Sequence, residues 1–260
     1  MNILITGGDG YIAQNLFIGL ASKYNITKIT RQNFDLTSYD ETCEWFNKRQ
    51  FDVVIHTAIS GGSRLHEDEN SVFENNMAMF NNLVVNKHCF SKLISFGSGA
   101  ELFHGDTPYA NSKREIEKQI LDYSNFYNLR IFGVFDHTEL NTRFIKSNII
   151  RYIKKEPMLI HTNKIMDFFY IKDLINLVEH YIQNDNLVKT VNCSYETKST
   201  LVNIAKFINK LSNYEVPINI NIKDSLEFYC GNSDLPIETL GLEQGIVDTY
   251  KIIKNNSCII

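Results

Sequence analysis

Three polar side chains near the middle of the sequence have the types and spacing of a proton-transfer site: Ser98, Tyr109 and Lys113. Tyr109 and Lys113 are four positions apart in a segment that opens a helix at Pro108, so both lie on one helix face. A free tyrosine has a pKa of about 10, and an adjacent ammonium lowers that value by stabilising the phenolate. Ser98 would hydrogen-bond a substrate oxygen that it shares with Tyr109. The set predicts acid/base catalysis, although Tyr-x-x-x-Lys pairs also occur on solvated helix faces and Ser-Gly turns are common.

A glycine-rich turn follows the first apolar run of the sequence and precedes a helical pattern. Glycines at this place permit a sharp turn and a close approach of the backbone to a pyrophosphate, and the helix N-terminus offers N–H groups to the phosphates. The glycines alone are ambiguous, because an ordinary tight turn can have the same residues. The strand before the turn and the helix after it favour a dinucleotide-binding site. The turn is Gly7-Gly8-Asp9-Gly10-Tyr11-Ile12-Ala13, and the residues expected to bind a dinucleotide are Gly7, Gly10, Tyr11 and Ile12.

Arg31 at the end of the second expected strand bears on the choice of cofactor. An acidic residue there would bind the ribose 2′-hydroxyl of NAD, whereas an arginine suits the 2′-phosphate of NADP. Asp and Glu are both missing between Ile26 and Asn33. The sequence therefore favours NADP(H) over NAD(H). Two alternatives stay open, because Arg31 is also compatible with a solvated loop and Asp9 would repel a 2′-phosphate.

Strand-like apolar runs alternate with helical patterns through the first two-thirds of the chain. This order predicts an α/β fold, a Rossmann doubly wound parallel sheet whose strands are buried on both faces. The expected strands are Asn2–Ile5, Ile26–Thr30, Phe34–Leu36, Asp52–Thr57, Lys92–Phe96, Leu129–Val134 and Val188–Asn192. The expected helices are Tyr11–Lys23, Ser38–Arg49, Ser71–Cys89, Ser112–Tyr127, Phe144–Lys154, Asp173–Gln183, Leu201–Leu211 and Leu242–Ile253.

The pattern loosens beyond about residue 140, which indicates a second, smaller part. Residues 1–160 are expected to form the dinucleotide-binding domain, and residues 165–195 are expected to return to it. Residues 196–260, with parts of 136–165, would form a C-terminal substrate-binding lobe.

Composition excludes several classes of function. A formal net charge of −4 without a long basic run argues against nucleic-acid binding. The apolar runs are too short to span a bilayer, and a first strand at residue 2 leaves no room for a signal peptide. Five scattered cysteines without a Cys-x-x-Cys pair argue against a disulfide framework or a zinc site. We expect a cytoplasmic protein that binds no membrane and no metal.

The motifs fall in the order seen in extended short-chain dehydrogenases/reductases, the NAD-dependent epimerase/dehydratase family. The chain resembles that family over roughly residues 1–175, and it is most similar to the GDP-fucose synthase-type nucleotide-sugar reductases. The residues that carry the resemblance are the glycine turn, Val54–Ala58, Glu74-Asn75, Gly97-Ser98, Tyr109 with Lys113, and Asp167–Leu174.

The resemblance implies a role for each matching residue. Tyr109 would be the acid/base, Lys113 would hold the nicotinamide ribose, and Ser98 would orient the reacting oxygen. Further cofactor contacts would come from Asp35, Leu36, Ala58, Asn75 and Val134, and substrate contacts from Ser98, Gly99, Arg143 and Lys146. The family also implies a homodimer, built from the helices expected over Ser71–Cys89 and Ser112–Tyr127.

Departures from the family pattern narrow the activity. Gly99-Ala100 replaces the Asp-Glu pair of sugar dehydratases, and Ala100 also replaces the cysteine that GDP-fucose synthase uses for epimerisation. Met166 stands where the family often carries a substrate-binding arginine. The simplest prediction is an NADPH-dependent reductase of a nucleotide-linked 4-keto-(6-deoxy)sugar. The alternatives are an NAD-dependent nucleotide-sugar epimerase and a non-catalytic cofactor-binding protein of the same fold.

Overall fold

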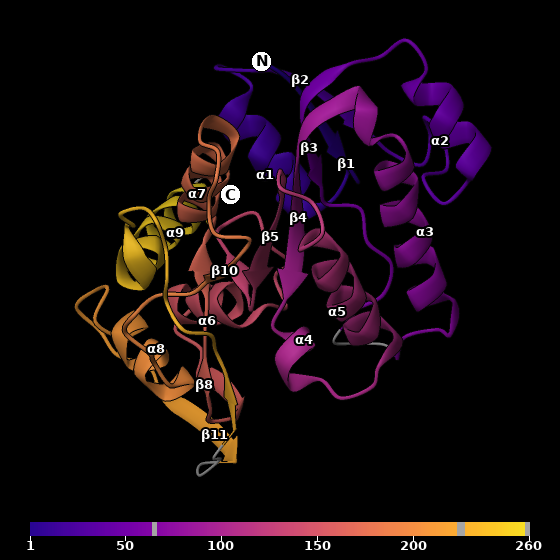
Figure 1. The fold of residues 1–260 in the computed structure, drawn as a ribbon. Coiled ribbons are helices and arrows are strands. Elements are labelled where there is room, and N and C mark those ends of the chain that lie inside the picture. Colours follow the sequence, from indigo (N-terminus) through magenta and orange to yellow (C-terminus); the bar gives the residue numbers. More distant parts are fainter. Residues whose placement is uncertain (64–66, 223–226, 258–260) are drawn as a thin grey trace. The chain divides into compact units, whose positions relative to one another are not determined.

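The computed structural model describes residues 1–63, 67–222 and 227–257, which form two compact units (Figure 1). The first comprises Met1–Ile131 and Ile175–Val191, and the second comprises Phe132–Leu174 and Asn192–Ile260. The dinucleotide-binding domain expected over residues 1–160, with residues 165–195 returning to it, stays a prediction. The chain beyond Ile131 packs within the second unit, where Phe132 contacts Tyr229 edge-on with 5.5 Å between ring centroids.

A six-stranded sheet in the order β10-β5-β4-β3-β1-β2 forms the centre of the first unit. Its strands are β1 (Asn2–Thr6), β2 (Asn25–Ile29), β3 (Phe51–His56), β4 (Phe90–Ser98), β5 (Phe126–Ile131) and β10 (Thr190–Cys193). Neighbours among β1 to β5 pair in parallel. Because β2 and β3 lie on opposite sides of β1, the strand order switches at the carboxyl ends of β1 and β3, where such folds bind ligands. The predicted Rossmann-type α/β fold is confirmed.

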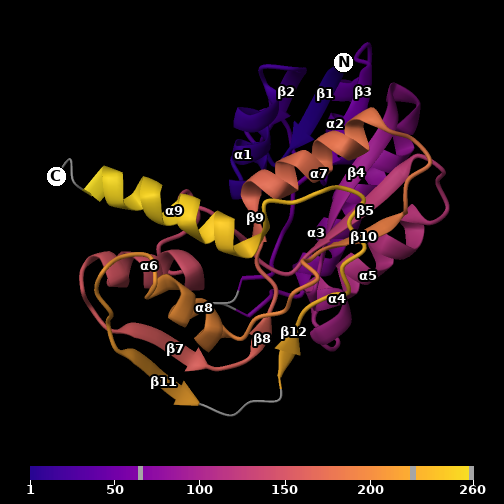
Figure 2. The same ribbon diagram turned by 90° about the vertical axis from the view of Figure 1, so that its left-hand side faces the viewer.

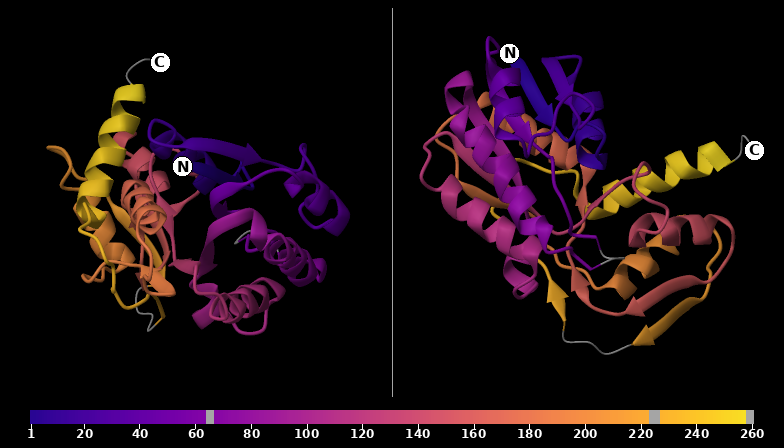
Figure 3. Two further views of the ribbon diagram at one scale, coloured as in Figure 1. Left: turned by 45° about the horizontal axis from the view of Figure 1, so that its top comes forward. Right: turned by 90° about the vertical axis from the view of Figure 1, so that its right-hand side faces the viewer.

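Helices cover both faces of this sheet. On one face α3 (Ser71–Val85) and α5 (Pro108–Ile120) lie side by side, and on the other lie α1 (Tyr11–Leu20) and α7 (Ile171–Gln183) (Figures 1 and 3). One apolar cluster joins the sheet to α3 through buried Leu4, Val54 and Phe80. The short elements of this unit are α2 (Tyr39–Phe46), α4 (Ala100–Phe103) and a 3-10 turn over Lys87–Cys89.

The strand expected over Phe34–Leu36 is wrong, because this segment is an irregular loop. Phe34 and Leu36, the apolar residues that suggested a strand, are buried in the apolar cluster instead. The Asp35 carboxylate accepts hydrogen bonds from the N–H and the hydroxyl of Thr37 at 2.9 and 2.8 Å. Such a local turn competes with extended backbone.

Helix α5 begins at Pro108, as the Pro108–Lys113 segment indicated, and not at Ser112, and it ends at Ile120, before the expected Tyr127. Thr107 caps it by accepting a hydrogen bond from the N–H of Ala110 at 3.2 Å, and proline is favoured at the first helical position. The earlier start places both Tyr109 and Lys113 inside the helix. The helix expected over Ser71–Cys89 likewise ends at Val85 and continues only as the 3-10 turn.

Within its described residues, the second unit contains three short parallel strand pairs and three helices, most of which are labelled in Figure 2. The pairs are β6 (Val134–Phe135) with β9 (Phe169–Tyr170), β7 (Met158–Thr162) with β11 (Ile218–Ile222), and β8 (Ile165–Met166) with β12 (Phe228–Tyr229). The helices are α6 (Phe144–Ile153), α8 (Leu201–Ile208) and α9 (Gly241–Ser257). Asp173 fixes the start of α9, because its buried carboxylate accepts the N–H groups of Leu240 and Gly241 at 2.8 and 3.0 Å.

Two expectations about the class of protein can be compared with this structure. Within the described part of the chain, no helix combines the length and apolar character needed to cross a bilayer. The cysteines in that part are free thiols, whereas Cys258 lies outside the described residues.

Candidate active site

Ser98 is the last residue of β4 and lies at the carboxyl edge of the sheet. The strand extends two residues beyond the expected end at Phe96, so Ser98 belongs to a fixed element and is only 8% exposed. The Ser98 hydroxyl oxygen accepts the N–H of Ala100 at 3.2 Å, while Gly99 donates its N–H to Ile131 at 2.8 Å. Accepting this bond does not use the hydroxyl proton, which a serine can donate to a substrate oxygen.

Lys113 reaches from α5 to the end of the same strand. Its ammonium donates a hydrogen bond to the Phe96 carbonyl at 2.5 Å and lies 5.9 Å from the centroid of the Tyr109 ring. Burial lowers the pKa of Lys113 to about 8, and the charge of Glu101 opposes that shift. A buried ammonium near a phenol stabilises the phenolate, which is the function predicted for Lys113.

The loop after β3 packs against the Tyr109 ring. Gly62 has φ of +71°, and a Cβ atom there would lie 2.7 Å from the ring. Fully buried Asn76 on α3 holds the loop, because its side chain accepts the N–H of Ser60 at 2.8 Å and donates to the Ser60 carbonyl at 3.0 Å. The same amide donates to the Ser112 hydroxyl on α5 at 3.0 Å. Asn76 therefore ties the loop to the helix that carries Tyr109.

The sequence singled out Asn75 instead of Asn76. Asn75 is half-buried on α3, and its contact with the cofactor stays a prediction. Asn75 was singled out by the family resemblance, and the structural role of its buried neighbour Asn76 was not predicted.

The glycine turn has the backbone geometry that a dinucleotide requires. Gly7 has φ of +65°, and a Cβ atom there would lie 2.7 Å from the backbone of Ala58, so the ends of β1 and β3 approach closely. Gly10 donates its N–H to the Gly7 carbonyl at 2.9 Å and caps α1. The first N–H groups of a helix lack intrahelical acceptors, and Gly10 has no side chain to satisfy them. Half-buried Tyr11 and Ile12 begin that helix.

Thr6 and His56 fix the two strand ends beside this turn. The Thr6 hydroxyl is hydrogen-bonded to His56 Nδ1 at 2.9 Å and accepts the N–H of Ala58 at 3.2 Å. Burial, with the charge of Lys113, lowers the pKa of His56 to about 3, so this imidazole is neutral at neutral pH. Thr6 and His56 thus hold the turn without adding a charge to it. Its glycine backbone and the uncapped N-terminus of α1 fit the pyrophosphate of NAD(P).

The loop after β2 presents Arg31 to solvent, as an exposed guanidinium. The N–H and hydroxyl of Thr37, together with the charge of Arg31, lower the pKa of Asp35. The Asp35 carboxylate is therefore ionised and bound locally. Leu36 is buried, and its carbonyl accepts a hydrogen bond from Asn82 at 2.9 Å. Adenine contacts of Asp35 and Leu36 stay predictions.

The remaining predicted residues, Val134, Arg143 and Lys146, belong to the second unit. Arg143 is exposed at the N-cap of α6. The Lys146 ammonium donates a hydrogen bond to the main-chain carbonyl of Glu139. The main-chain N–H of Lys146 donates to the Glu139 carboxylate at 3.3 Å. Of these two predicted substrate cations, Arg143 is the one that solvent reaches most easily. Val134 lies in β6, and its cofactor contact stays a prediction.

Sequence reasoning missed two charged residues with many partners. Lys198 ion-pairs with buried Asp167 at 2.9 Å and also donates to the Tyr195 carbonyl at 2.7 Å, so its charge is neutralised inside the second unit. Glu101 pairs with Arg130 at 2.6 Å directly beneath Ser98. Its sequence signal is the spacing Ser98-x-x-Glu101, which is typical of a helix capping box.

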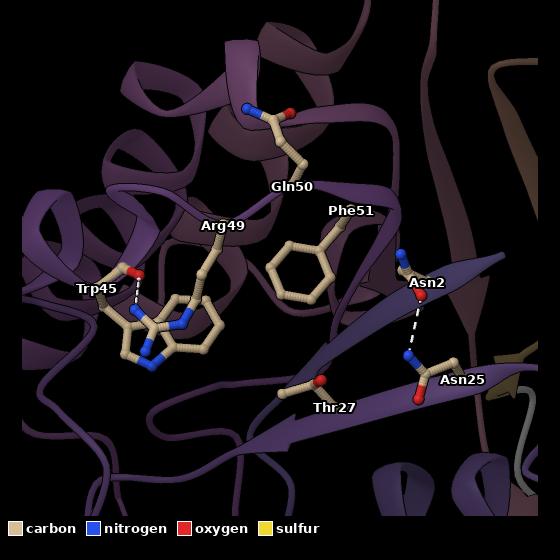
Figure 4. Close-up of a pocket in the computed structure, with 7 residues that line it drawn as sticks. All are labelled: Asn2, Asn25, Thr27, Trp45, Arg49, Gln50 and Phe51. Atoms are coloured by element: carbon tan, nitrogen blue, oxygen red, sulfur yellow. Dashed lines mark hydrogen bonds between the residues drawn. The ribbon is translucent and has the colours of Figure 1, made fainter.

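A pocket on the first unit lies away from these residues (Figure 4). It is lined by Trp45, Arg49 and Gln50 and by the first residues of three strands, Asn2, Asn25 and Phe51, together with Thr27. The Arg49 guanidinium lies over the Trp45 ring, 4.8 Å from its centroid. Ligands of doubly wound sheets bind at the carboxyl ends of the strands. This pocket is at the amino ends, so it is not the candidate active site.

A family of known proteins matches the part of the chain that contains the glycine turn and the six-stranded sheet. Residues 3–194 match the model of the NAD dependent epimerase/dehydratase family. The chain belongs to this family. As a member of the NAD-dependent epimerase/dehydratase family it is an enzyme of the NAD(P)-dependent oxidoreductase type, which confirms the resemblance found in the sequence.

Individual known proteins resemble the chain at low identity. The CDP-abequose synthase of Yersinia pseudotuberculosis is 24% identical over 240 residues, 81% of this chain and 84% of that protein. The GDP-mannoheptose C4 reductase of Campylobacter jejuni, solved with NADP bound, has a TM-score of 0.79 and 17% identity over 97% of this chain and 98% of that one. The UDP-glucose 4-epimerase of Thermotoga maritima, solved with UDP-glucose, has a TM-score of 0.80 and 15% identity over 99% and 100%. At these identities the solved structures show the shared fold.

Proposed function

We propose that this family member reduces the ketone of a nucleotide-linked 4-keto-(6-deoxy)sugar with NADPH. The observation that carries the proposal is the buried Lys113 ammonium, bound to the end of β4 and 5.9 Å from the Tyr109 ring centroid. Burying a charge costs free energy, and buried ionisable groups with shifted pKa values cluster at functional sites. A phenol that must give up a proton is helped by a positive charge nearby.

The proposed chemistry assigns one task to each side chain. NADPH, when bound, supplies the hydride that adds to the ketone carbon. Tyr109 donates its proton to the ketone oxygen, which becomes the alcohol, and Tyr109 regains a proton from solvent. Ser98 donates a hydrogen bond to that oxygen, and Lys113 lowers the pKa of Tyr109 so that the transfer proceeds near neutral pH.

The residues beside Ser98 support reduction without a second reaction. Gly99 and Ala100 carry no group able to exchange a proton next to the ketone, and Ala100 is only 2% exposed. Dehydration and epimerisation both need such a group. Simple carbonyl reduction is the chemistry that the remaining residues can perform.

An assay of the purified protein with NADPH and a panel of nucleotide-linked 4-keto-6-deoxysugars tests the proposal. We expect oxidation of NADPH with at least one member and formation of the corresponding alcohol. Normal NADPH binding together with no turnover of any member would reject the reductase function.

Tyr109→Phe tests whether the protein is an enzyme at all. We expect kcat to fall by about 10²–10⁴-fold, the usual effect of removing an acid/base group, while NADPH still binds. Tyr123→Phe is the matched control, because this tyrosine follows the same helix and stacks on Phe126 at 4.5 Å, away from Ser98. If the Tyr109→Phe protein keeps full biological activity with bound cofactor, the protein is a non-catalytic member of the fold.

The solved UDP-glucose 4-epimerase supports one alternative, an NAD-dependent nucleotide-sugar epimerase. Such an enzyme keeps its cofactor and returns the hydride to the opposite face of the sugar. Exposed Arg31 favours NADP instead, since it can neutralise a 2′-phosphate. The nucleotide that co-purifies decides between the two: tightly held NAD supports the epimerase, and exchangeable NADPH supports the reductase.

The proposal also includes a cytoplasmic homodimer. The supporting observation is exposed apolar side chains at the ends of the two adjacent helices: Val85, the last residue of α3, is 48% exposed, and Leu121, directly after α5, is 59% exposed. Isologous contacts between such patches generate closed dimers. Sedimentation velocity at micromolar concentration measures the association state directly, and a monomer there would reject this part.

A further inference from the structure

Gly97 is the point where three parts of the candidate site meet. The carbonyl of the residue before it, Phe96, accepts the Lys113 ammonium at 2.5 Å. The N–H of the residue after it, Ser98, donates to the Glu101 carboxylate at 2.7 Å. A Cβ atom on Gly97 would lie 2.6 Å from that carboxylate, so glycine permits the close approach. Glu101 and Lys113 thus bind either side of one residue of β4.

Glu101 is the centre of a buried ion network. Its second carboxylate oxygen accepts Nε of Arg130 on β5 at 2.6 Å, and the Arg130 guanidinium also binds Glu117 on α5. Arg114 donates to the Glu101 carbonyl at 3.1 Å. The Glu101 side chain is 1% exposed, so its position is fixed by these bonds and not by solvent.

A helix cap explains only part of this arrangement. The Ser98-x-x-Glu101 spacing and the bond to the Ser98 N–H resemble a capping box, although the N-cap of α4 is Gly99. Surface caps of this kind need neither burial nor a buried arginine partner. Burial raises the pKa of Glu101 to about 7, against the lowering by Arg130, which shows how costly the ionised carboxylate is here.

We propose that Glu101 is a positioning residue of the active site, which anchors the main chain of Ser98 and serves as the buried counter-charge that keeps Lys113 protonated. The proposal rests on the proposed reductase function for its effect on rate. The two roles use different properties of the side chain. Anchoring needs an acceptor oxygen at the full length of the glutamate side chain, whereas the counter-charge needs only the negative charge.

Two variants separate these properties. Glu101→Gln keeps the length and removes the charge, and Glu101→Asp keeps the charge but is one methylene too short to reach the Ser98 N–H. Glu115→Gln is the matched control, because Glu115 is on the same helix as Lys113 and pairs instead with Lys118 at 4.0 Å. Circular dichroism and NADPH binding verify that each variant is folded.

The first measurement reports the charge of Lys113 without any substrate. Acetic anhydride labels unprotonated amines, so labelling of Lys113 between pH 6 and 11, followed by peptide mass spectrometry, gives its pKa, with Lys118 as the internal reference. We expect Glu101→Gln to lower the pKa of Lys113 by about one unit, and Glu101→Asp and Glu115→Gln to leave it within error. An unchanged Lys113 pKa in Glu101→Gln would overturn the counter-charge role.

The second measurement is the pH dependence of kcat/KM for NADPH-dependent reduction. Activity needs protonated Lys113, so the rate falls as pH rises through about 8, and Glu101→Gln moves that fall to lower pH. Glu101→Asp should lower kcat by about 10- to 100-fold through misplacement of Ser98, without moving the fall. Full kcat in Glu101→Asp would overturn the anchoring role. The titratable and charged groups that face the pair are Arg130 on β5, Glu117, Arg114 and Tyr109 on α5, and the neutral His56 on β3, and none of them is altered.

The two measurements also distinguish this inference from the proposed function. If no nucleotide sugar is reduced, the labelling experiment still decides whether Glu101 holds the charge of Lys113. If reduction occurs and the Lys113 pKa does not respond, the reductase stands and the counter-charge role fails.

Discussion

Asn76 shows how one buried amide can organise residues that do the chemistry. Its side chain uses both donor and acceptor capacity on Ser60 and also binds Ser112, so the loop after β3 and helix α5 are held by a single group. A hydrophobic residue of the same size would fill the space but leave the N–H and carbonyl of Ser60 without these partners. The amide is therefore retained for the position of its neighbours as much as for packing.

Asn76→Ala should destabilise the protein by about 1–3 kcal/mol, because it leaves buried polar groups of Ser60 and Ser112 unsatisfied. Asn75→Ala is the matched control, one position away and half-buried. We expect it to leave the free energy of unfolding nearly unchanged and, if Asn75 lines the cofactor groove, to weaken NADPH binding. Urea unfolding of both variants measures the difference, and equal stability would contradict the role given to Asn76.

Residue types and spacing were sufficient to single out Ser98, Tyr109 and Lys113, because acid/base chemistry restricts both. The sequence did not single out Glu101 or Asn76 as residues of the site. Glu101 nevertheless binds the Ser98 N–H, and Asn76 binds Ser112, the residue before Lys113. Their partners Arg130 and Ser112 lie 29 and 36 positions away along the chain. Such contacts depend on which strands become neighbours, and local patterns carry no information about that order.

Helices and strands were predicted best where burial and periodicity agree. The strands of the sheet read as apolar runs and were located to within a few residues. Errors arose where capping chemistry overrode apolar content: Thr107 and Pro108 start α5 before its first apolar residues, and the turn at Asp35 prevents a strand. In the second unit, strands such as β6 and β9 have only two residues each, too few to produce a pattern.

The packing of the β3–α3 loop on α5 leads to a prediction about Gly62. Gly62→Ala places a methyl group 2.7 Å from the Tyr109 ring at a φ of +71°, which L-residues adopt at a cost of about 1–2 kcal/mol. The ring must move, and we expect kcat to fall by about 10- to 100-fold. Gly105→Ala is the control, because a Cβ atom there meets nothing within 4 Å. Steady-state reduction assays on both variants make the comparison, and unimpaired turnover in Gly62→Ala would mean that the loop does not position Tyr109.

At the scale of the whole chain, residues 175–191 return to the first unit after residues 132–174 have formed part of the second. Helix α7 makes that return, and its C-terminal end is held by Lys92 of β4. The buried Lys92 ammonium donates to the carbonyls of Tyr181 and Asn184 at 2.8 and 2.7 Å and pairs with Asp185 at 2.9 Å. A cation at this end also interacts favourably with the helix dipole. One side chain thus joins segments about ninety positions apart.

Lys92→Met should therefore lower the free energy of unfolding of the first unit by about 2–4 kcal/mol, since the carbonyls at the end of α7 lose a charged donor. Lys23→Met is the matched control. Lys23 also binds α7, through Glu179 at 2.7 Å, but its side chain is 57% exposed, and pairs of this kind contribute little. Trp45, the single tryptophan of the sequence, packs against the core of the first unit, so its fluorescence during urea unfolding reports on that unit. A Lys92→Met midpoint that matches Lys23→Met would show that α7 is held to the sheet by its apolar face alone.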